Sequence, residues 1–241
     1  MTQRRFWISV AIISFSLFIA TESFAKEKPR MGVLRFSNNT GAGWWGGSTG
    51  RDLQDMLVAE LATKKCFSVL ERKELDAVMK EQNLGASGRV SKNTRAKIGN
   101  LTGAKYLVAA TVSSYEQSSS GGGGGISFKG ISVGGKRDRA YIAVDLKVID
   151  VDTGEIADVR TIEATSKSGG LNLGLSKGFF SGKLGQYKKT PAGKAIRACI
   201  MEIADYLECS LVKGKHHKCM ADFDAKESKR REKTKGSIDL E

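Results

Sequence analysis

The sequence has few of the groups on which catalysis usually depends. It contains two histidines, His216 and His217, which are neighbours in a charged C-terminal segment. No Ser/His/Asp arrangement or pair of carboxylates stands out, so we do not expect an enzyme. Cys219 lies close to the two histidines, but no fourth metal ligand is evident. A solvated tail is therefore the preferred interpretation, and neither a metal nor a cofactor is predicted.

The sequence is also poor in cysteine, with only four in 241 residues: Cys66, Cys199, Cys209 and Cys219. Four cysteines allow three disulfide connectivities. Cys199 and Cys209 fall in one predicted helix, about 15 Å apart at a rise of about 1.5 Å per residue, and so cannot pair with each other. We expect Cys66 and Cys199 to be buried thiols. Any disulfide is expected to join Cys209 and Cys219, because the chain between them can turn back.

The first 25 residues have the pattern of a signal peptide. Two arginines precede an apolar run over residues 6–20, and small residues follow at Ser23 and Ala25. Residues 1–25 are therefore predicted to be removed before Lys26, and the chain is predicted to leave the cytoplasm. The alternative is an uncleaved anchor, for which about 15 apolar residues would be short. No cysteine follows the apolar run, so no N-terminal lipidation site is expected.

The net charge of +13 would ordinarily raise nucleic acid as a partner, but export argues against it. The excess of basic residues more plausibly serves solubility or contact with anionic lipid headgroups. Part of this excess lies in the tail, residues 212–241. Its mixed charge and lack of apolar period predict a frayed helix or disorder.

A glycine-rich stretch raises the question of nucleotide binding. Residues 41–46 read G-A-G-W-W-G, the spacing of a dinucleotide fingerprint, and Glu71 stands roughly where such folds keep a ribose-binding acid. That motif requires a helix to begin within the glycines, so that its N–H groups meet the pyrophosphate. Here no helix is expected before Thr49. A P-loop is excluded because Gly47 stands where lysine is needed, so nucleotide binding is not expected.

The same stretch carries Trp44 and Trp45, the only tryptophans after the signal peptide. Two interpretations are open for this pair. The tryptophans could fold back onto the domain as a small apolar lid, or an exposed aromatic pair could mark a contact or pore-lining surface.

Hydrophobic periodicity predicts a mixed α/β (α+β) domain over residues 26–211, with an antiparallel meander. The alternation of Ile142, Val144, Leu146 and Val148 indicates a strand with one buried face. The predicted elements, in order, are strand 31–36, helix 49–64, strand 67–70, helix 73–83, helix 91–103, strand 106–115, strand 140–151, strand 156–165 and helix 190–211.

Two segments do not fit inside such a domain. Residues 116–139 and 166–189 are each about 24 residues long and rich in glycine and serine. Structureless loops of this length are uncommon in compact domains and need a reason.

Three stretches in the right order resemble the curli-secretion channel family, the CsgG/HfaB group. They are LERKELDAVMKEQNLGASG at 70–88, LTGAKYLVAATVSSYE at 101–116 and VDLKVIDVDTGEI at 144–156. The resemblance, over about residues 32–211, implies an outer-membrane, ring-shaped homo-oligomer with its α/β domain in the periplasm. It implies nucleotide-independent export of unfolded amyloid-like or adhesin subunits, a periplasmic accessory protein as partner, and contact with outer-membrane lipid. Nucleic acid is not an expected partner.

Subunits of this family insert two β-hairpins each into a shared barrel, and these hairpins fall at 116–139 and 166–189. A membrane-spanning strand takes about 9–11 residues, so each segment holds two strands and a turn. Four strands cannot close a barrel alone, so insertion requires oligomerisation. Flexible surface loops are the alternative, more so for the first segment, whose start lacks large apolar side chains. The candidate membrane residues are Ile126, Phe128, Ile131, Val133, Leu171, Leu173, Leu175, Phe179, Phe180 and Leu184.

Two features depart from the family. Its channels are typically lipoproteins, and their constriction loop, between the first strand and first helix, carries an aromatic–Asn–Phe ring. The corresponding loop here lacks an Asn-Phe pair, so Trp44 and Trp45 are the candidate constriction residues. The alternative function is a soluble periplasmic adaptor or regulator of envelope assembly with the same α/β domain. Such an adaptor would not require paired glycine-rich insertions.

Overall fold

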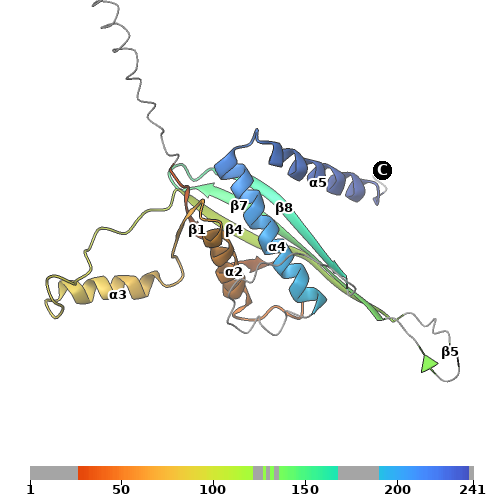
Figure 1. Ribbon diagram of the computed structural model, residues 1–241, viewed down its shortest axis with the longest axis horizontal. Coiled ribbons are helices and arrows are strands. Elements are labelled where there is room, and N and C mark those ends of the chain that lie inside the picture. The colour runs from red at the N-terminus through yellow and green to blue at the C-terminus, as the bar shows by residue number, and fades with distance from the viewer. Residues whose placement is uncertain (1–26, 122–126, 129–130, 133–135, 168–189, 239–241) are drawn as a thin grey trace, which may run out of the picture.

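The computed structural model describes residues 27–121, 127–128, 131–132, 136–167 and 190–238. A six-stranded mixed sheet forms its centre, in the order β3-β1-β4-β7-β8, with β2 paired to β4 (Figure 1). β1 is parallel to β3 and β4, whereas β4, β7 and β8 form an antiparallel meander. The predicted mixed α/β domain with a meander is therefore confirmed. The strands are β1 (Arg30–Val33), β2 (Ser37–Asn38), β3 (Ser68–Leu70), β4 (Tyr106–Gly121), β7 (Lys136–Asp150) and β8 (Ile156–Lys167).

Two helices cover one face of this sheet (Figure 1). They are α2 (Thr49–Thr63) and α4 (Pro191–Leu207), and α4 continues into a π-helical turn, η2 (Glu208–Lys213). Pro191 occupies the first turn of α4, where its missing N–H costs nothing, and Thr190 caps the helix by accepting the Gly193 N–H at 3.1 Å. Among the helices of the described chain, none is long and apolar enough to cross a membrane.

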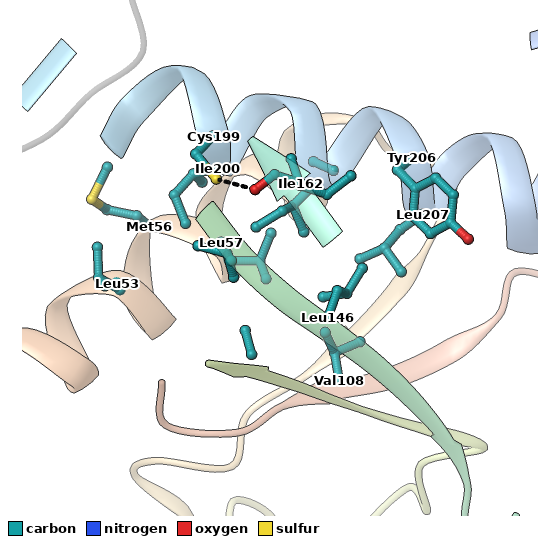
Figure 2. Close-up of a cluster of buried hydrophobic side chains, with 14 of the residues drawn as sticks. Leu53, Met56, Leu57, Val108, Leu146, Ile162, Cys199, Ile200, Tyr206 and Leu207 are labelled. Atoms are coloured by element: carbon teal, nitrogen blue, oxygen red, sulfur yellow. Dashed lines mark hydrogen bonds between the residues drawn. The ribbon is translucent and has the colours of Figure 1, made fainter. Parts of the chain in front are cut away.

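The core lies between these helices and the sheet (Figure 2). Leu57, Val108, Leu146 and Leu207, from α2, β4, β7 and α4, are all 0% exposed. Burying each such side chain contributes about 1.5–3 kcal/mol, so this contact is the main stabilising one of the domain. Cys199 also lies here, and its thiol donates to the Ile162 carbonyl at 3.6 Å. Burial raises the pKa of this thiol, which is an inert core group as expected. The same prediction was wrong for Cys66, which is only partly buried.

The first glycine-rich segment continues the meander. β4 and β7 stay paired from Tyr106 opposite Asp150 as far as Gly121 opposite Lys136, well beyond the predicted strand ends. A further pair of short strands, β5 (Ser127–Phe128) and β6 (Ile131–Ser132), follows within the segment.

The second glycine-rich segment begins as β8, which is described to Lys167. Its remaining residues, 168–189, lie outside the described residues.

One predicted helix is absent. Residues 91–103 form exposed turns and irregular chain instead of a helix. Gly99 takes a left-handed conformation (φ +88°), which interrupts a helix. A segment this short needs tertiary packing to stay helical, and Ile98, at 61% exposed, is not buried by the described residues.

The helix before that segment forms but does not pack as its pattern suggests. α3 (Leu75–Ala86) stands away from the sheet (Figure 1), and Gly85 is its one buried residue. Val78 and Met79 of its apolar stripe are 37% and 41% exposed. The stripe therefore predicts the helix correctly but not its burial within this chain.

The C-terminal tail forms a helix, one of the two predicted outcomes, and this helix is regular over 18 residues. Residues 218–235 form α5 (Lys218–Lys235), which is tied to η2 by a disulfide between Cys209 and Cys219. Phe223 is buried and its ring packs edge-to-face on Tyr206, with centroids 5.2 Å apart. The disulfide was the predicted pairing. The packing of this helix could not be predicted from the sequence, because Phe223 and a neighbouring methionine, too few for an apolar period, are its buried residues.

Candidate functional site

The loop between β2 and α2, residues 39–48, is held at both ends by its own polar side chains. At its start the Asn38 Oδ1 accepts hydrogen bonds from the Thr40 backbone N–H (3.0 Å) and hydroxyl (2.7 Å). At its end the Gly46 N–H donates to the Thr49 hydroxyl at 2.9 Å. These local hydrogen bonds pair with backbone groups that would otherwise be paired within a helix or between strands. The loop therefore has a defined shape rather than a merely flexible one.

The loop joins α2 at a close backbone contact. A Cβ at Gly50 would lie 2.4 Å from the Phe36 carbonyl oxygen, nearer than real Cβ atoms come to backbone. Glycine is needed here because α2 starts directly against the backbone of the chain between β1 and β2, with the Phe36 N–H donating to the Gly50 carbonyl at 3.2 Å. Arg35 closes the arrangement by donating to the Gly47 carbonyl at 2.8 Å.

Trp44 and Trp45 lie together at the tip of this loop, in a turn closed by a bond from the Trp45 N–H to the Ala42 carbonyl (3.0 Å). Their rings meet edge-to-face with centroids 5.6 Å apart, and the Trp44 ring lies 5.2 Å from that of Tyr115. Both tryptophans are partly buried against the core. The indole N–H of Trp44 is buried without a hydrogen-bond partner among the described residues. The geometry is that of the apolar lid, the first of the two interpretations.

A β-bulge in β4 places Tyr115 under the tryptophans. The register of β4 against β7 shifts between Val112, which faces Val144, and Ser114. The extra residue moves Tyr115 opposite Ile142, on the face that the helices cover. Tyr115 contacts the tryptophan pair, and the sequence analysis did not predict this contact. A bulge has no reliable sequence signal, so simple alternation would have placed this ring on the opposite face.

The other candidate residues fall in the glycine-rich segments. Phe128 and Ile131 are opposite each other in the β5–β6 pair. Ile126 and Val133 lie outside the described residues. So do the candidates of the second segment, which are Leu171, Leu173, Leu175, Phe179, Phe180 and Leu184. Their membrane role stays a prediction.

The structure confirms the helix start on which the argument against nucleotide binding depends. α2 begins at Thr49, after the last glycine of the fingerprint, so its N–H groups do not lie within the glycine pattern. Glu71 is not turned to a ribose site but to the start of α3, where its carboxylate accepts the N–H groups of Glu74 (3.0 Å) and Lys73 (2.6 Å). These bonds, that from Glu74 first, lower the pKa of Glu71.

The metal-like cluster proves to be a helix cap next to a disulfide. Cys209, His217 and Cys219 bring their ligand atoms within 4.8 Å of one another. However, the two sulfurs are joined, and the His217 Nδ1 accepts the Cys219 N–H at 3.2 Å at the start of α5. In this oxidised form the cluster offers one imidazole and no thiolate, which is too few ligands for a zinc site.

Comparison with known proteins adds three findings. The family described as "Curli production assembly/transport component CsgG" matches residues 14–238. Curated proteins of that description from Escherichia coli K12 and Salmonella typhimurium are 33% and 31% identical over 105 residues, which is 42% of this chain and 38% of each relative. A solved hypothetical protein from Chlamydia trachomatis is 13% identical with a TM-score of 0.44, covering 78% of this chain and 100% of that one.

Proposed function

We propose, because this chain belongs to the curli production assembly/transport component (CsgG) family, that it is a subunit of an oligomeric outer-membrane secretion channel. The family's description is that of a transport component rather than an enzyme. In this proposal, copies of the chain form a ring, and unfolded amyloid-like or adhesin polypeptides diffuse outward through it without nucleotide hydrolysis. A periplasmic accessory protein and outer-membrane lipid are the further partners.

The observation that carries this proposal is the length of the β4–β7 ribbon. Beyond the bulge, the two strands remain paired to Gly121 and Lys136. Among the described residues, β8 accompanies β7 as far as Lys167 opposite Arg139, so the last β4–β7 pairs, from Ser119 opposite Asp138 to Gly121 opposite Lys136, form a two-stranded ribbon. An isolated two-stranded ribbon is marginally stable at best. Neighbouring subunits that close a barrel would supply the missing strand partners.

The tryptophan loop supports the same arrangement. Trp44 packs on Tyr115, which directly precedes the ribbon's exposed stretch. The loop therefore sits at the base of the first candidate hairpin, where the mouth of a channel would be. In a ring of subunits, repetition of the partly exposed Trp44–Trp45 pair would line the opening with aromatic rings, the role of a constriction.

The test uses the second glycine-rich segment. Leu171, Leu173 and Leu175 alternate with Asn172 and Gly174, so the leucines are predicted to face lipid. An arginine on the lipid face costs about 2–4 kcal/mol at the membrane midplane, in every subunit, and far less on the lumen face. Leu173→Arg should therefore prevent insertion, whereas Asn172→Arg should preserve assembly and alter conductance.

Planar-bilayer conductance, with heat-modified gel migration as the assembly assay, reads out both variants. Circular dichroism should show an intact α/β domain in each, because the core stripe of β7 is unchanged. Full-sized channels from Leu173→Arg would refute the pore. A wild-type chain found only in the soluble periplasmic fraction would favour the adaptor instead.

A further inference from the structure

Helix α5 runs alongside β8 towards the end of the sheet from which both glycine-rich segments leave. Near its start, Asp224 pairs with Arg160 of β8 at 2.6 Å. Two turns later, Arg230 lies 3.9 Å from Glu163, further along the same strand. Figure 1 shows the C-terminus of α5 above the far end of β8. The last turns of α5 are thus held beside the hairpin bases.

A hollow of about 660 Å³ lies where these turns meet the sheet. Three basic side chains line it: Arg230 and Lys233 from α5, and Arg139 from β7. Hydroxyl groups of Ser118 and Thr165, on the adjoining strands, line it too. Guanidinium, ammonium and hydroxyl donors around one hollow are the groups that bind phosphate oxygens.

Two carboxylates also border this hollow, and their effect is limited. Glu163 is engaged, since it accepts the Tyr141 hydroxyl at 2.9 Å and lies by Arg230. Glu116 is exposed at the rim. The carboxylates therefore leave the inner surface with an excess of donors.

The surroundings of the hollow are cationic as well. The last two turns of α5 read K-R-R-E-K-T-K over residues 229–235, five cations to one acid. Lys229, Lys233 and Lys235 form no ion pair with the described residues. At the adjoining sheet end, Arg139 of β7 is opposite Lys167 of β8. Arg230 and Arg231 are held by Glu227, but the unpaired Lys229, Lys233 and Lys235 gathered at this edge indicate an anionic ligand rather than a stabilising network.

We propose that this hollow and the cationic turns around it bind the phosphate headgroup of an anionic phospholipid at the periplasmic surface of the membrane. The proposal rests on the proposed function, because the hairpins set which end of the sheet meets the membrane. A polybasic surface next to a membrane gains about fivefold in binding for each basic residue near the headgroups. Bound lipid would seat the α/β domain against the membrane beneath the barrel.

The test measures lipid binding separately from conductance. The purified full chain in a neutral detergent is titrated by calorimetry with dioctanoyl phosphatidylglycerol, dioctanoyl phosphatidylcholine, inorganic phosphate and an acidic peptide. We expect phosphatidylglycerol to bind at least tenfold tighter than phosphatidylcholine, with an affinity that falls as salt rises. The variant Lys229→Glu/Lys233→Glu should lose tenfold or more of that affinity.

A charge-matched control separates this site from net charge. Lys92→Glu/Lys97→Glu makes the same charge change on the exposed loop after α3, far from α5 (Figure 1), and should bind phosphatidylglycerol like the wild type. Equal losses in both variants would overturn the proposal, as would equal binding of both lipids. Preference for free phosphate would indicate an anion site without lipid, and preference for the peptide a protein partner; either outcome would overturn it. A wild-type chain that binds phosphatidylglycerol but forms no conducting channel would count against the channel and not against the lipid site.

Discussion

The disulfide between Cys209 and Cys219 should account for a measurable part of the stability of this protein. It joins the π-helical turn η2 to the first turn of α5, across a sequence separation of 10 residues. Replacing both cysteines by serine removes the crosslink, and the volume at each position changes little. Serine at position 209, which is buried, keeps a small side chain in that place.

The size of the effect follows from loop closure. In the chain-entropy model, a crosslink that closes a 10-residue loop lowers the entropy of the unfolded chain by about 9 cal/mol/K, or about 2.7 kcal/mol at 25 °C. For a chain of this size that corresponds to a fall in Tm of roughly 5–10 °C. Without the crosslink, Phe223 on Tyr206 is among the few buried contacts that hold α5, so this helix should loosen before the rest of the domain unfolds.

Thermal and urea unfolding followed by circular dichroism would measure this effect, with and without dithiothreitol. Reductant should lower the Tm of the wild type to that of Cys209→Ser/Cys219→Ser and leave that variant unchanged. Cys66→Ser is the control, since Cys66 is a free, partly exposed thiol. Peptide mapping under non-reducing conditions should recover the Cys209–Cys219 pair. If the oxidised wild type and the double variant unfold at the same urea concentration, the crosslink does not act on the unfolded chain as argued.

Two further predictions concern the core and the C-terminal helix. Leu57→Ala should lower the free energy of unfolding by about 2–5 kcal/mol, because it opens a cavity between α2 and the sheet. The control Val159→Ala, at a site that is 59% exposed, should change this free energy by less than about 0.5 kcal/mol. Urea unfolding of the two variants and the wild type measures both effects. The hydrogen bond from Arg230 lowers the pKa of Glu227 to about 2, so its stabilising contribution is complete above about pH 4.5 and is lost as pH falls towards 2. The Tm difference between the wild type and Glu227→Gln should therefore shrink over that range and stay constant above it.

Hydrophobic periodicity correctly predicts those elements whose apolar residues recur regularly and form one buried face. Ile142, Val144, Leu146 and Val148 alternate, and all four are buried on one face of β7. Cap chemistry at Thr190 likewise fixed the start of α4. These signals are local, and the packing that they predict lies within the same domain.

The parts that sequence could not predict depend on contacts between distant segments. α5 is ordered because Phe223 meets Tyr206 and Asp224 meets Arg160, and neither contact leaves an apolar period in the tail. Residues 91–103 have a helix-like pattern, but they are exposed, and no surface of the part of the chain that the structure describes buries them. In both cases the presence of a packing surface decides whether the segment is helical, and helix propensity alone does not report on that surface.

The bulge in β4 has consequences beyond the aromatic cluster that it assembles. β4 and β7 are at once core strands and the legs of the first candidate hairpin, so the register set in the core passes into the hairpin without a break. A slip of one residue would turn Ile142 and Val144 from the helices to the open face, at a cost of several buried side chains. The core therefore fixes which hairpin residues face each side, even where the ribbon itself has little apolar surface. This explains how a segment rich in serine and glycine, with weak pairing preferences of its own, is held in a single register.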